Sequence, residues 1–554
     1  MLSQTAGQVL YALLTRPPPS PEGSSRLACV KHSVSVHPEP GSNSSFNLFN
    51  SVKFTDNLHQ FIVVFAFIVF LYSVANVLNI ILSRFLADKI YSTTDIIFRQ
   101  HFFLIFLFFV KYIFIKSSSN DTILYKIFIY ERWLLMSDFK EILTLAEEIY
   151  FNPELGFKEN KTSQLIQNFI KKVYPKGEII KFAETGVKFN LGEKKALHIA
   201  LIAEMDAVYT PSHFHADKLT GAAHNCGHYS QVAIMLSLLK KLITDEEYKR
   251  LDFSLGFIFT PAEEYLDLEY RKELQREGVI SFLGGKPEAI KLGIFDEYDL
   301  AIAVHSMGGE LDRRSIELNC NLAGFLYKYY TFKGKPAHAG FAPQAGVNAY
   351  SMSTLFNTAL GLYRQQIDEK FMVRINPVIM ESHMGTNVIP DKIKIGTDIR
   401  AHSVEYMLEL SKRLDTMAKC SAEALGGEVE IETDIGYLPF IQSRYLSNFV
   451  KKSFEEFEEI EYCKDNSPVS AAGDIGDLSY ILPCIQIGYN GFIGTFHGSD
   501  FIHKDSEYIF SIFPRFLLKV LKDMSGKIDK NSLYKRSYED YKNTILNFGG
   551  LDEK

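Results

Sequence analysis

The chain has 554 residues, of which 47% are hydrophobic and 23% charged, the balance of a globular protein large enough for two or three domains. Its net charge of -7 provides no basic field for nucleic acid, so a nucleic-acid partner is not expected. The six cysteines are widely scattered, which is unlike a disulfide framework and favours a reduced, cytoplasmic protein.

The N-terminal segment, residues 1–135, is more apolar than the rest of the chain. Residues 61–82 are long and apolar enough to span a bilayer as a helix, whereas the shorter run at 102–115 is interrupted by Lys111. Two interpretations stay open: a membrane anchor, or a start assigned too far upstream. We favour the second, because residues 17–45 have no helical or strand periodicity and a helix begins directly after Met136.

Strands and helices alternate after Met136. Apolar runs predict buried strands at 196–203, 253–260 and 300–305, and helical periodicity predicts helices at 138–150, 160–174 and 228–243. This alternation predicts a largely parallel sheet with helices on both faces.

A second pattern begins near Phe325. The order becomes strand, helix, strand, strand, helix, strand, predicted at 325–333, 347–363, 372–380, 391–400, 404–425 and 427–433. This order is that of a ferredoxin-like α+β unit. The α/β pattern resumes with a helix at 442–461, a strand at 484–489 and a helix at 506–524, so one domain is inserted in another. The predicted division is an N-terminal segment 1–135, a first domain in two parts, 136–324 and 436–530, an inserted domain 325–435 and a tail 531–554.

Cys226, Gly227 and His228 form the strongest local signal. A cysteine and a histidine two residues apart in an extended turn point to the same side, and both are good ligands for zinc-like ions. A buried structural cysteine beside an unrelated histidine is the plainer interpretation, and the pair alone does not exclude it.

Carboxylates follow two of the predicted strands. At the irregular end of strand 253–260, both Glu263 and Glu264 can reach one site, where one carboxylate binds a metal and the other accepts a proton from water. Asp206, just past strand 196–203, can bridge metals or orient a ligand. A solvated acidic pair and an exposed strand-end acid are the alternatives.

Three further histidines are candidates. His305 ends an apolar strand, where open α/β sheets place their sites. His497 lies in a glycine-rich loop after strand 484–489 and competes with His503 for a role. His338, in the inserted domain, can reach over as a donor to a tetrahedral oxyanion, although a solvated loop histidine is the alternative.

Taken together, these residues resemble the di-metal aminoacylase and glutamate-carboxypeptidase metallopeptidase family, in particular its amidohydrolase branch of hippurate, auxin-conjugate and aminobenzoyl-glutamate hydrolases. The resemblance covers about residues 138–525. It rests on the order and spacing of NPELGFKE (152–159), AEMDAV (203–208), TGAAHNCGH (220–228), TPAEE (260–264), AVHSM (303–307), GKPAHAG (334–340), GTNVIPD (385–391) and HGSDF (497–501). Two departures are Tyr229, where many members carry an acid or an amide, and residues 470–479, which look like the aminobenzoyl-glutamate branch.

The resemblance implies a zinc-peptidase-like catalytic domain of α/β fold, with an inserted lid that also forms a homodimer. It implies two divalent metal ions, zinc or manganese, held by Cys226, His228, Glu264, His305 and His497. The implied substrate is a small N-acyl amino acid, an aminobenzoyl-glutamate-like conjugate or a dipeptide.

The same resemblance assigns roles to the remaining candidates. Glu263 is the implied general base, and Asp206 matches the aspartate that orients a ligand. His338 matches a histidine that reaches the neighbouring subunit's site. Asn387 and Arg400 stand where members hold a substrate carboxylate or carbonyl, a role that suits bidentate arginine pairing.

Two rival functions stay open. In the first, Cys226 is a nucleophile activated by a histidine. This leaves four candidates without a role: Glu263, Glu264, His305 and His497. In the second, the chain is a noncatalytic, membrane-tethered binding protein, which the intact ligand set argues against. A membrane is an expected partner only if residues 61–82 are a real anchor.

Overall fold

The computed structural model describes residues 137–308, 312–382 and 385–549, so both the expected anchor at 61–82 and the start at Met136 lie outside the described residues. Within the described ranges, no helix is long and apolar enough to cross a membrane. Residues 137–150 are helical, in agreement with the helix predicted at 138–150.

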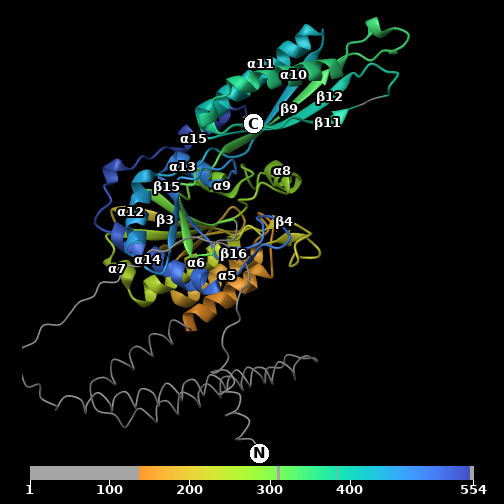
Figure 1. Cartoon of the computed structure of the whole chain (residues 1–554). Coiled ribbons are helices and arrows are strands. Elements are labelled where there is room, and N and C mark those ends of the chain that lie inside the picture. The colour runs from red at the N-terminus through yellow and green to blue at the C-terminus, as the bar shows by residue number, and fades with distance from the viewer. Residues whose placement is uncertain (1–136, 309–311, 383–384, 550–554) are drawn as a thin grey trace, which may run out of the picture. The chain divides into compact units, whose positions relative to one another are not determined.

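A mixed sheet of eight strands, in the order β1-β2-β6-β3-β7-β15-β8-β14, forms the centre of the fold (Figure 1). The strands are β1 (Ile179–Phe182), β2 (Gly186–Leu191), β3 (Leu197–Glu204), β6 (Phe253–Thr260), β7 (Leu300–Ser306), β8 (Ser315–Leu318), β14 (Tyr462–Asp465) and β15 (Cys484–Tyr489). The central strands β6, β3, β7 and β15 are parallel, which confirms the mostly parallel sheet. The antiparallel pairs β1–β2, β2–β6 and β8–β15 flank them.

Burial on both faces explains why the central strands read as unbroken apolar runs. Every residue of β3 and of β6 is buried. Side chains alternate across the sheet, so Ile199 and Leu201 of β3 join one apolar cluster while Ala200 and Ile202 join the other. The sheet is therefore the middle layer of an α/β/α arrangement.

The two helical layers come from different parts of the chain. The helix at 137–150, α5 (Asn160–Val173), α6 (His228–Thr244), α12 (Arg444–Glu455) and α14 (Phe513–Met524) share one cluster with the sheet. The other cluster takes side chains from α8 (Leu268–Arg276), α9 (Gly285–Lys291), α13 (Ile475–Ile481) and α15 (Tyr538–Asn547). The remaining short elements are α7 (Glu247–Arg250) and the hairpins β4 (Val208–Tyr209) with β5 (Ala222–Ala223) and β16 (Phe492–Ile493) with β17 (Ile502–His503).

Two predicted helices differ in detail from the structure. The helix expected at 442–461 is the shorter α12, Arg444–Glu455. The one expected at 506–524 is helical over that whole range but includes a π-helical turn, Tyr508–Ile512, before α14. Pro514 accounts for this, because proline fits the first turn of an α-helix and not its interior.

A second sheet lies in the inserted segment, by which we mean residues 324–435. Its elements are β9 (Gly324–Lys333), α10 (Ala349–Tyr363), β10 (Arg374–Ile375), β11 (Val378–Ser382), β12 (Lys392–Ala401), α11 (Val404–Ala424) and β13 (Glu428–Ile435). The strand order is β10-β12-β9-β13, with β11 also paired to β12, and all pairs are antiparallel. Helices α10 and α11 cover one face (Figure 1). The single strand predicted at 372–380 is divided into β10 and β11, which both pair with β12.

Candidate metal centre

The candidate side chains gather at the carboxyl ends of the central strands. Glu204 ends β3, Glu263 and Glu264 follow β6, and His305 lies near the end of β7. Parallel strands bring these ends to one edge of the sheet, where open α/β folds place their sites. His228 begins α6, and Cys226 precedes it in the same turn.

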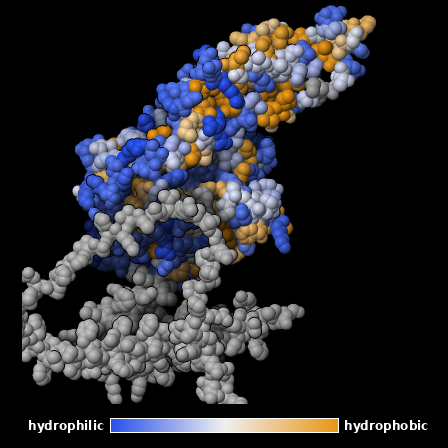
Figure 2. Space-filling model, in the orientation of Figure 1, coloured by the Kyte–Doolittle hydropathy of each residue, from blue (hydrophilic) through white to orange (hydrophobic). Residues whose placement is uncertain are grey.

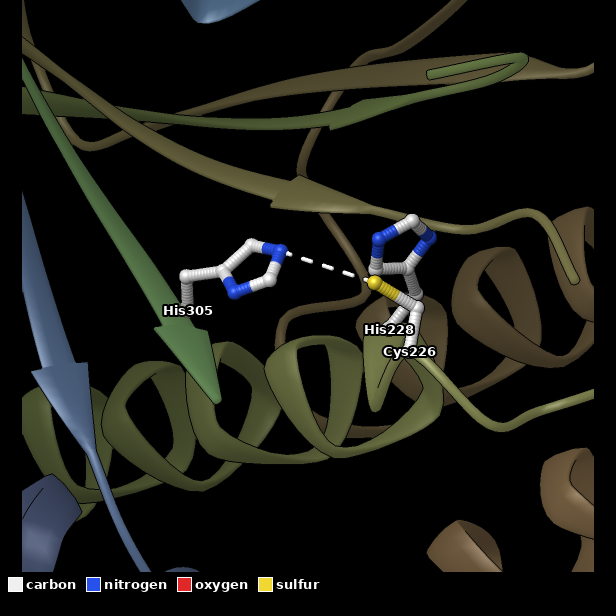
Figure 3. Close-up of side chains that lie close together, drawn as sticks. All are labelled: Cys226, His228 and His305. Carbon is white, nitrogen blue, oxygen red and sulfur yellow. Dashed lines mark hydrogen bonds between the residues drawn. The ribbon is translucent and has the colours of Figure 1, made fainter. Parts of the chain in front are cut away.

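Cys226, His228 and His305 converge, as Figure 3 shows, with the Cys226 sulfur facing the His305 ring. Their ligand atoms all lie within 4.8 Å of one another, and Cys226 Sγ is 3.8 Å from His305 Nε2. Ligands about 2.1–2.3 Å from a zinc-like ion are separated by similar distances. Gly227 makes this approach possible, because its φ is +90° and a Cβ would lie 2.7 Å from Ser306 Oγ.

A second group consists of Cys226, Glu264 and His497, whose ligand atoms also lie within 4.8 Å of one another. His497 Nε2 lies 3.1 Å from Glu264 Oε1. Because Cys226 belongs to both groups, the geometry suits two cation positions that share one thiolate. The five side chains expected to converge are therefore close together.

The hydrogen bonds of the two imidazoles leave one nitrogen of each ring directed at the centre. Nδ1 of His228 bonds the backbone oxygen of Asp206 at 2.9 Å, and Nδ1 of His305 bonds that of Ser306 at 2.9 Å. Since a carbonyl only accepts, both Nδ1 atoms donate, and in the neutral rings that bind metal both Nε2 atoms keep a lone pair. His228 Nε2 is buried and makes no hydrogen bond within the described residues, which is the state of an atom that fits a metal ion.

Asp206 orients its neighbours. Its Oδ1 lies 3.2 Å from His228 Nδ1, and its Oδ2 accepts from the Glu264 backbone N–H at 3.0 Å. One buried carboxylate thus fixes a ring and a backbone segment that both belong to the candidate centre. Of the two roles open for Asp206, this geometry favours the orienting one.

Electrostatics prepare the thiolate form of Cys226. Burial alone would raise the pKa of its thiol, and so would Glu264, yet His228 and His305 lower that pKa to about 6. Although burial opposes the charged ring, Cys226 and the nearby acids raise the pKa of His228 well above its ordinary value. A thiolate is the form that binds metal.

Glu263 and Glu264 have opposite environments although they are adjacent. Burial and the carboxylates of Glu204 and Glu264 raise the pKa of Glu263 well above its usual range. Burial also acts on Glu264, but His497 and its other neighbours lower the pKa of that carboxyl to about 2. Such a division suits two different roles for the adjacent carboxyls, a proton acceptor at Glu263 and an ionised carboxylate at Glu264.

The sequence profile of the peptidase family M20/M25/M40 matches residues 200–517, more than half of the chain. The chain belongs to this family. With the two converging ligand groups, family membership makes it a metal-dependent hydrolase of amide bonds that takes two divalent ions.

Two relatives illustrate the range of this family. An IAA-amino acid hydrolase, ILR1-like 4, of Arabidopsis thaliana is 25% identical over 369 residues, which are 64% of this chain and 77% of the relative. An N-acyl-L-amino acid amidohydrolase of Geobacillus stearothermophilus is 24% identical over 312 residues, or 54% of this chain and 78% of the relative.

Solved structures share the fold. The Bacillus subtilis YXEP protein, described as a dinuclear metal binding peptidase of the M20 family, superposes with a TM-score of 0.57 at 16% identity, covering 71% of this chain and 100% of its own. The aminobenzoyl-glutamate utilization protein of Klebsiella pneumoniae gives 0.51 at 15% identity, covering 72% and 99%.

In this M20 peptidase, hydrogen bonds with Asn225 position the loop that contains His497. The Asn225 carbonyl accepts from the His497 N–H at 3.0 Å, and its side-chain Nδ2 donates to the Gly498 carbonyl at 2.8 Å. His497 itself has a φ of +57°, uncommon for a residue with a Cβ. Asn225, which directly precedes Cys226, thus holds the loop that carries His497. Sequence reasoning did not single it out.

His503 has another role. Its Nδ1 lies 2.7 Å from the hydroxyl of Tyr229, the residue that departs from the family pattern after His228. His503 is therefore paired with the start of α6, whereas His497 faces Glu264.

A buried lysine behind the centre was also missed. Lys286 is fully buried; its Nζ donates to Glu204 Oε1 at 2.6 Å and to Asp474. The other oxygen of Glu204 lies 3.3 Å from His228 Nε2. Nothing in the sequence distinguishes Lys286 from a surface lysine, because its partners are 82 and 188 residues away.

The remaining predicted site residues lie in the inserted segment. Nδ1 of the exposed His338 accepts from the Gly340 and Phe341 N–H groups, so its Nε2 is directed elsewhere. The Asn387 carbonyl accepts from the Ala339 N–H at 2.9 Å, which puts the two loops side by side. In the described chain, the hydrogen bonds of these two loops do not reach the metal ligands.

Arg400 lies on the sheet face of the inserted segment that α10 and α11 leave uncovered. Its Nε donates to Asp398 at 2.8 Å and its Nη1 to the Ser470 carbonyl at 3.1 Å. Ser470 precedes the loop of Gly473, at which a Cβ would lie 3.0 Å from Glu263 Oε1. Arg400 is therefore linked to a loop that lines the candidate centre.

Proposed function

We propose that this chain hydrolyses the amide bond of a small N-acyl amino acid, an aminobenzoyl-glutamate-like conjugate or a dipeptide. The observation that carries the proposal is the pair of ligand groups sharing Cys226, with the buried Glu263 beside them. The named activities of the relatives support this substrate class.

In the proposed centre, Cys226, His228, Glu264, His305 and His497 hold two divalent ions, zinc or manganese. Bound ions of this kind polarise an amide carbonyl and make water more acidic. The mixed sulfur, nitrogen and oxygen donor set suits either metal. Convergence of five donors favours this role for Cys226 over that of a nucleophile.

Glu263 is the proposed general base. It accepts a proton from the attacking water and passes it to the leaving amine, and the raised pKa of its carboxyl favours proton uptake. Asp206 keeps Nδ1 of His228 protonated and so keeps Nε2 directed inward.

The inserted domain, 325–435, is proposed as a lid and a dimerisation domain. Strand β11 supports this, because it pairs only with β12 within the described chain and Val378, Ile379 and Met380 are 49–60% exposed. Figure 2 shows apolar surface on this segment. An uncovered apolar edge strand is a template for pairing with a second copy.

A homodimer would give His338 a partner site. In the proposal, its free Nε2 donates to the oxyanion in the neighbouring subunit, while Asn387 and Arg400 hold a substrate carboxylate or carbonyl. The free and widely spaced cysteines support a reducing, cytoplasmic location.

The test is a hydrolysis screen of N-acyl amino acids, aminobenzoyl-glutamate and dipeptides on the metal-loaded chain. Glu263→Gln should lower kcat on the best substrate by about 10²–10⁴-fold with metal still bound. Glu369→Gln, at an exposed glutamate, is the matched control and should leave kcat unchanged. Near-normal turnover by the Glu263 variant would contradict the proposed base.

A further inference from the structure

The inserted segment joins the rest of the chain through two short stretches, residues 322–325 and 436–440, which we call the connecting ribbon. They hydrogen-bond to each other: Phe325 N–H to the Tyr437 carbonyl at 2.8 Å, Gly436 N–H to the Phe325 carbonyl at 3.1 Å, and Leu322 with Phe440 in both directions at 3.1 Å. Both exits of the inserted segment are thereby one structural unit.

Tyr437 extends from this ribbon to the proposed base. It is buried, and its hydroxyl donates to the backbone carbonyl of Glu263 at 2.5 Å, across 174 residues of sequence. Its ring packs with those of Tyr265 and Phe325, at centroid distances of 5.3–5.4 Å and nearly perpendicular planes. Packing of this kind fixes the ring, so the hydroxyl has a defined position.

Tyr265 makes the corresponding bond in the opposite direction. It follows Glu264, and its hydroxyl donates to the carbonyl of Ile435, the last residue of β13, at 3.0 Å. The two tyrosines belong to one aromatic cluster, but only Tyr437 bonds the peptide of Glu263. That difference makes Tyr265 a matched control.

The backbone around Glu263 is held on each side. The Ala262 N–H bonds Glu159 at 2.9 Å, the Glu264 N–H bonds Asp206, and the Glu264 carbonyl accepts from Arg271 at 2.5 Å. Ala262 has a φ of +53°, a conformation that a residue with a Cβ adopts only when its surroundings enforce it. The bond to the Glu263 carbonyl completes this set, and it comes from the ribbon.

We propose that Tyr437 is a positioning residue for Glu263, through which the connecting ribbon of the inserted segment sets the placement of the base. The inference rests on the proposed function of Glu263. Rotation of the inserted segment about its ribbon would displace the Tyr437 hydroxyl and with it the Glu263 peptide. A displacement of about 1 Å in a catalytic group can cost on the order of 100-fold in rate.

The experiment compares Tyr437→Phe with Tyr265→Phe in the full, metal-loaded chain. Both variants keep the ring and lose one hydroxyl. Tyr437→Phe should lower kcat about tenfold or more with KM within about twofold and unchanged metal content, because geometry and not binding is disturbed. Tyr265→Phe should keep kcat within about twofold. An unchanged kcat in Tyr437→Phe, or an equal fall in both variants, would overturn the inference.

Hydrogen exchange of the peptide covering residues 259–266 gives a readout that does not depend on activity. Tyr437→Phe should speed exchange there, and Tyr265→Phe should do so to a smaller extent. If the wild-type protein hydrolyses no amide but Tyr437→Phe still speeds exchange in this peptide, the proposed function fails, while the role of the Tyr437 hydroxyl in holding the Glu263 backbone is supported. If wild type is active and neither kcat nor exchange responds, the inference alone fails.

Discussion

Lys286→Met removes the only cation that lies between Glu204 and Asp474 in the described chain. All three side chains are at most 4% exposed, so the variant leaves the buried Asp474 without a counter-ion in the described chain. Within the same residues, it leaves Glu204 with only the imidazoles of His228 and His305 as ion-pair partners. Breaking a buried ion pair costs about 3–5 kcal/mol, which in a domain of this size lowers the Tm by roughly 6–20 °C.

A triple variant, Lys286→Met with Glu204→Gln and Asp474→Asn, is the matched control, because neutralising the whole group leaves no buried charge. Thermal melts of metal-free protein should show the triple variant melting well above the single one. The loss of thermal stability in the single variant, relative to wild type, should also become smaller as the pH is lowered from about 8 to about 5. Burial raises the pKa of Asp474 to about 6 even though Lys286 lowers it, so without Lys286 that pKa rises further above its unfolded value. The folded variant therefore binds more protons than the unfolded chain and gains stability as pH falls. Equal melting of the single and triple variants at neutral pH would refute the reasoning.

Three further outcomes are expected. In metal-free protein, the rate of alkylation of Cys226 should rise with pH, with a midpoint near its pKa of about 6, and added metal should block the reaction. Burial raises the pKa of Cys463 to about 11, so that thiol should stay unreactive at neutral pH. Peptide mass spectrometry checks both. Asn225→Ala should lower the affinity of one of the two metal positions by about 10–100-fold in a metal titration, because the loop that carries His497 loses the side-chain hydrogen bond from Asn225. An equal loss of affinity at both positions would count against this. Ile379→Lys should convert a dimer to a monomer in sedimentation, since a charge at an edge strand blocks pairing, and an unchanged mass would exclude β11 as the interface.

The central strands could be predicted from sequence because both of their faces are buried. All eight positions of β3 and β6 avoid solvent, so each appears as a continuous apolar run. Strand β1 could not be found in this way: it has four residues, and only Phe182 is buried. Short flanking strands acquire their pairing from neighbours that the local sequence does not reveal.

The candidate ligand residues could be picked out for a related reason. Cys226, Glu264 and His305 each stand at the end of an apolar run or the start of a helix, a place that sequence marks. Local pattern alone did not decide between His497 and His503, which are six residues apart. The family resemblance favoured His497, and in the structure their contacts with Glu264 and Tyr229 separate the two.

Lys286 and Tyr437 were invisible in the sequence. Their importance lies entirely in partners distant along the chain, Glu204 for the lysine and the Glu263 carbonyl for the tyrosine. Residues that support a site through long-range hydrogen bonds carry no local pattern.

Metal stoichiometry tests the central claim most directly. Purified wild-type chain, reconstituted with zinc or manganese and dialysed, should hold two equivalents per chain by elemental analysis. Cys226→Ser should lower the affinity of both metal positions together, because the Cys226 thiolate belongs to both ligand groups. A wild-type chain that retains no metal, or a Cys226→Ser chain that keeps both equivalents at wild-type affinity, would contradict the account.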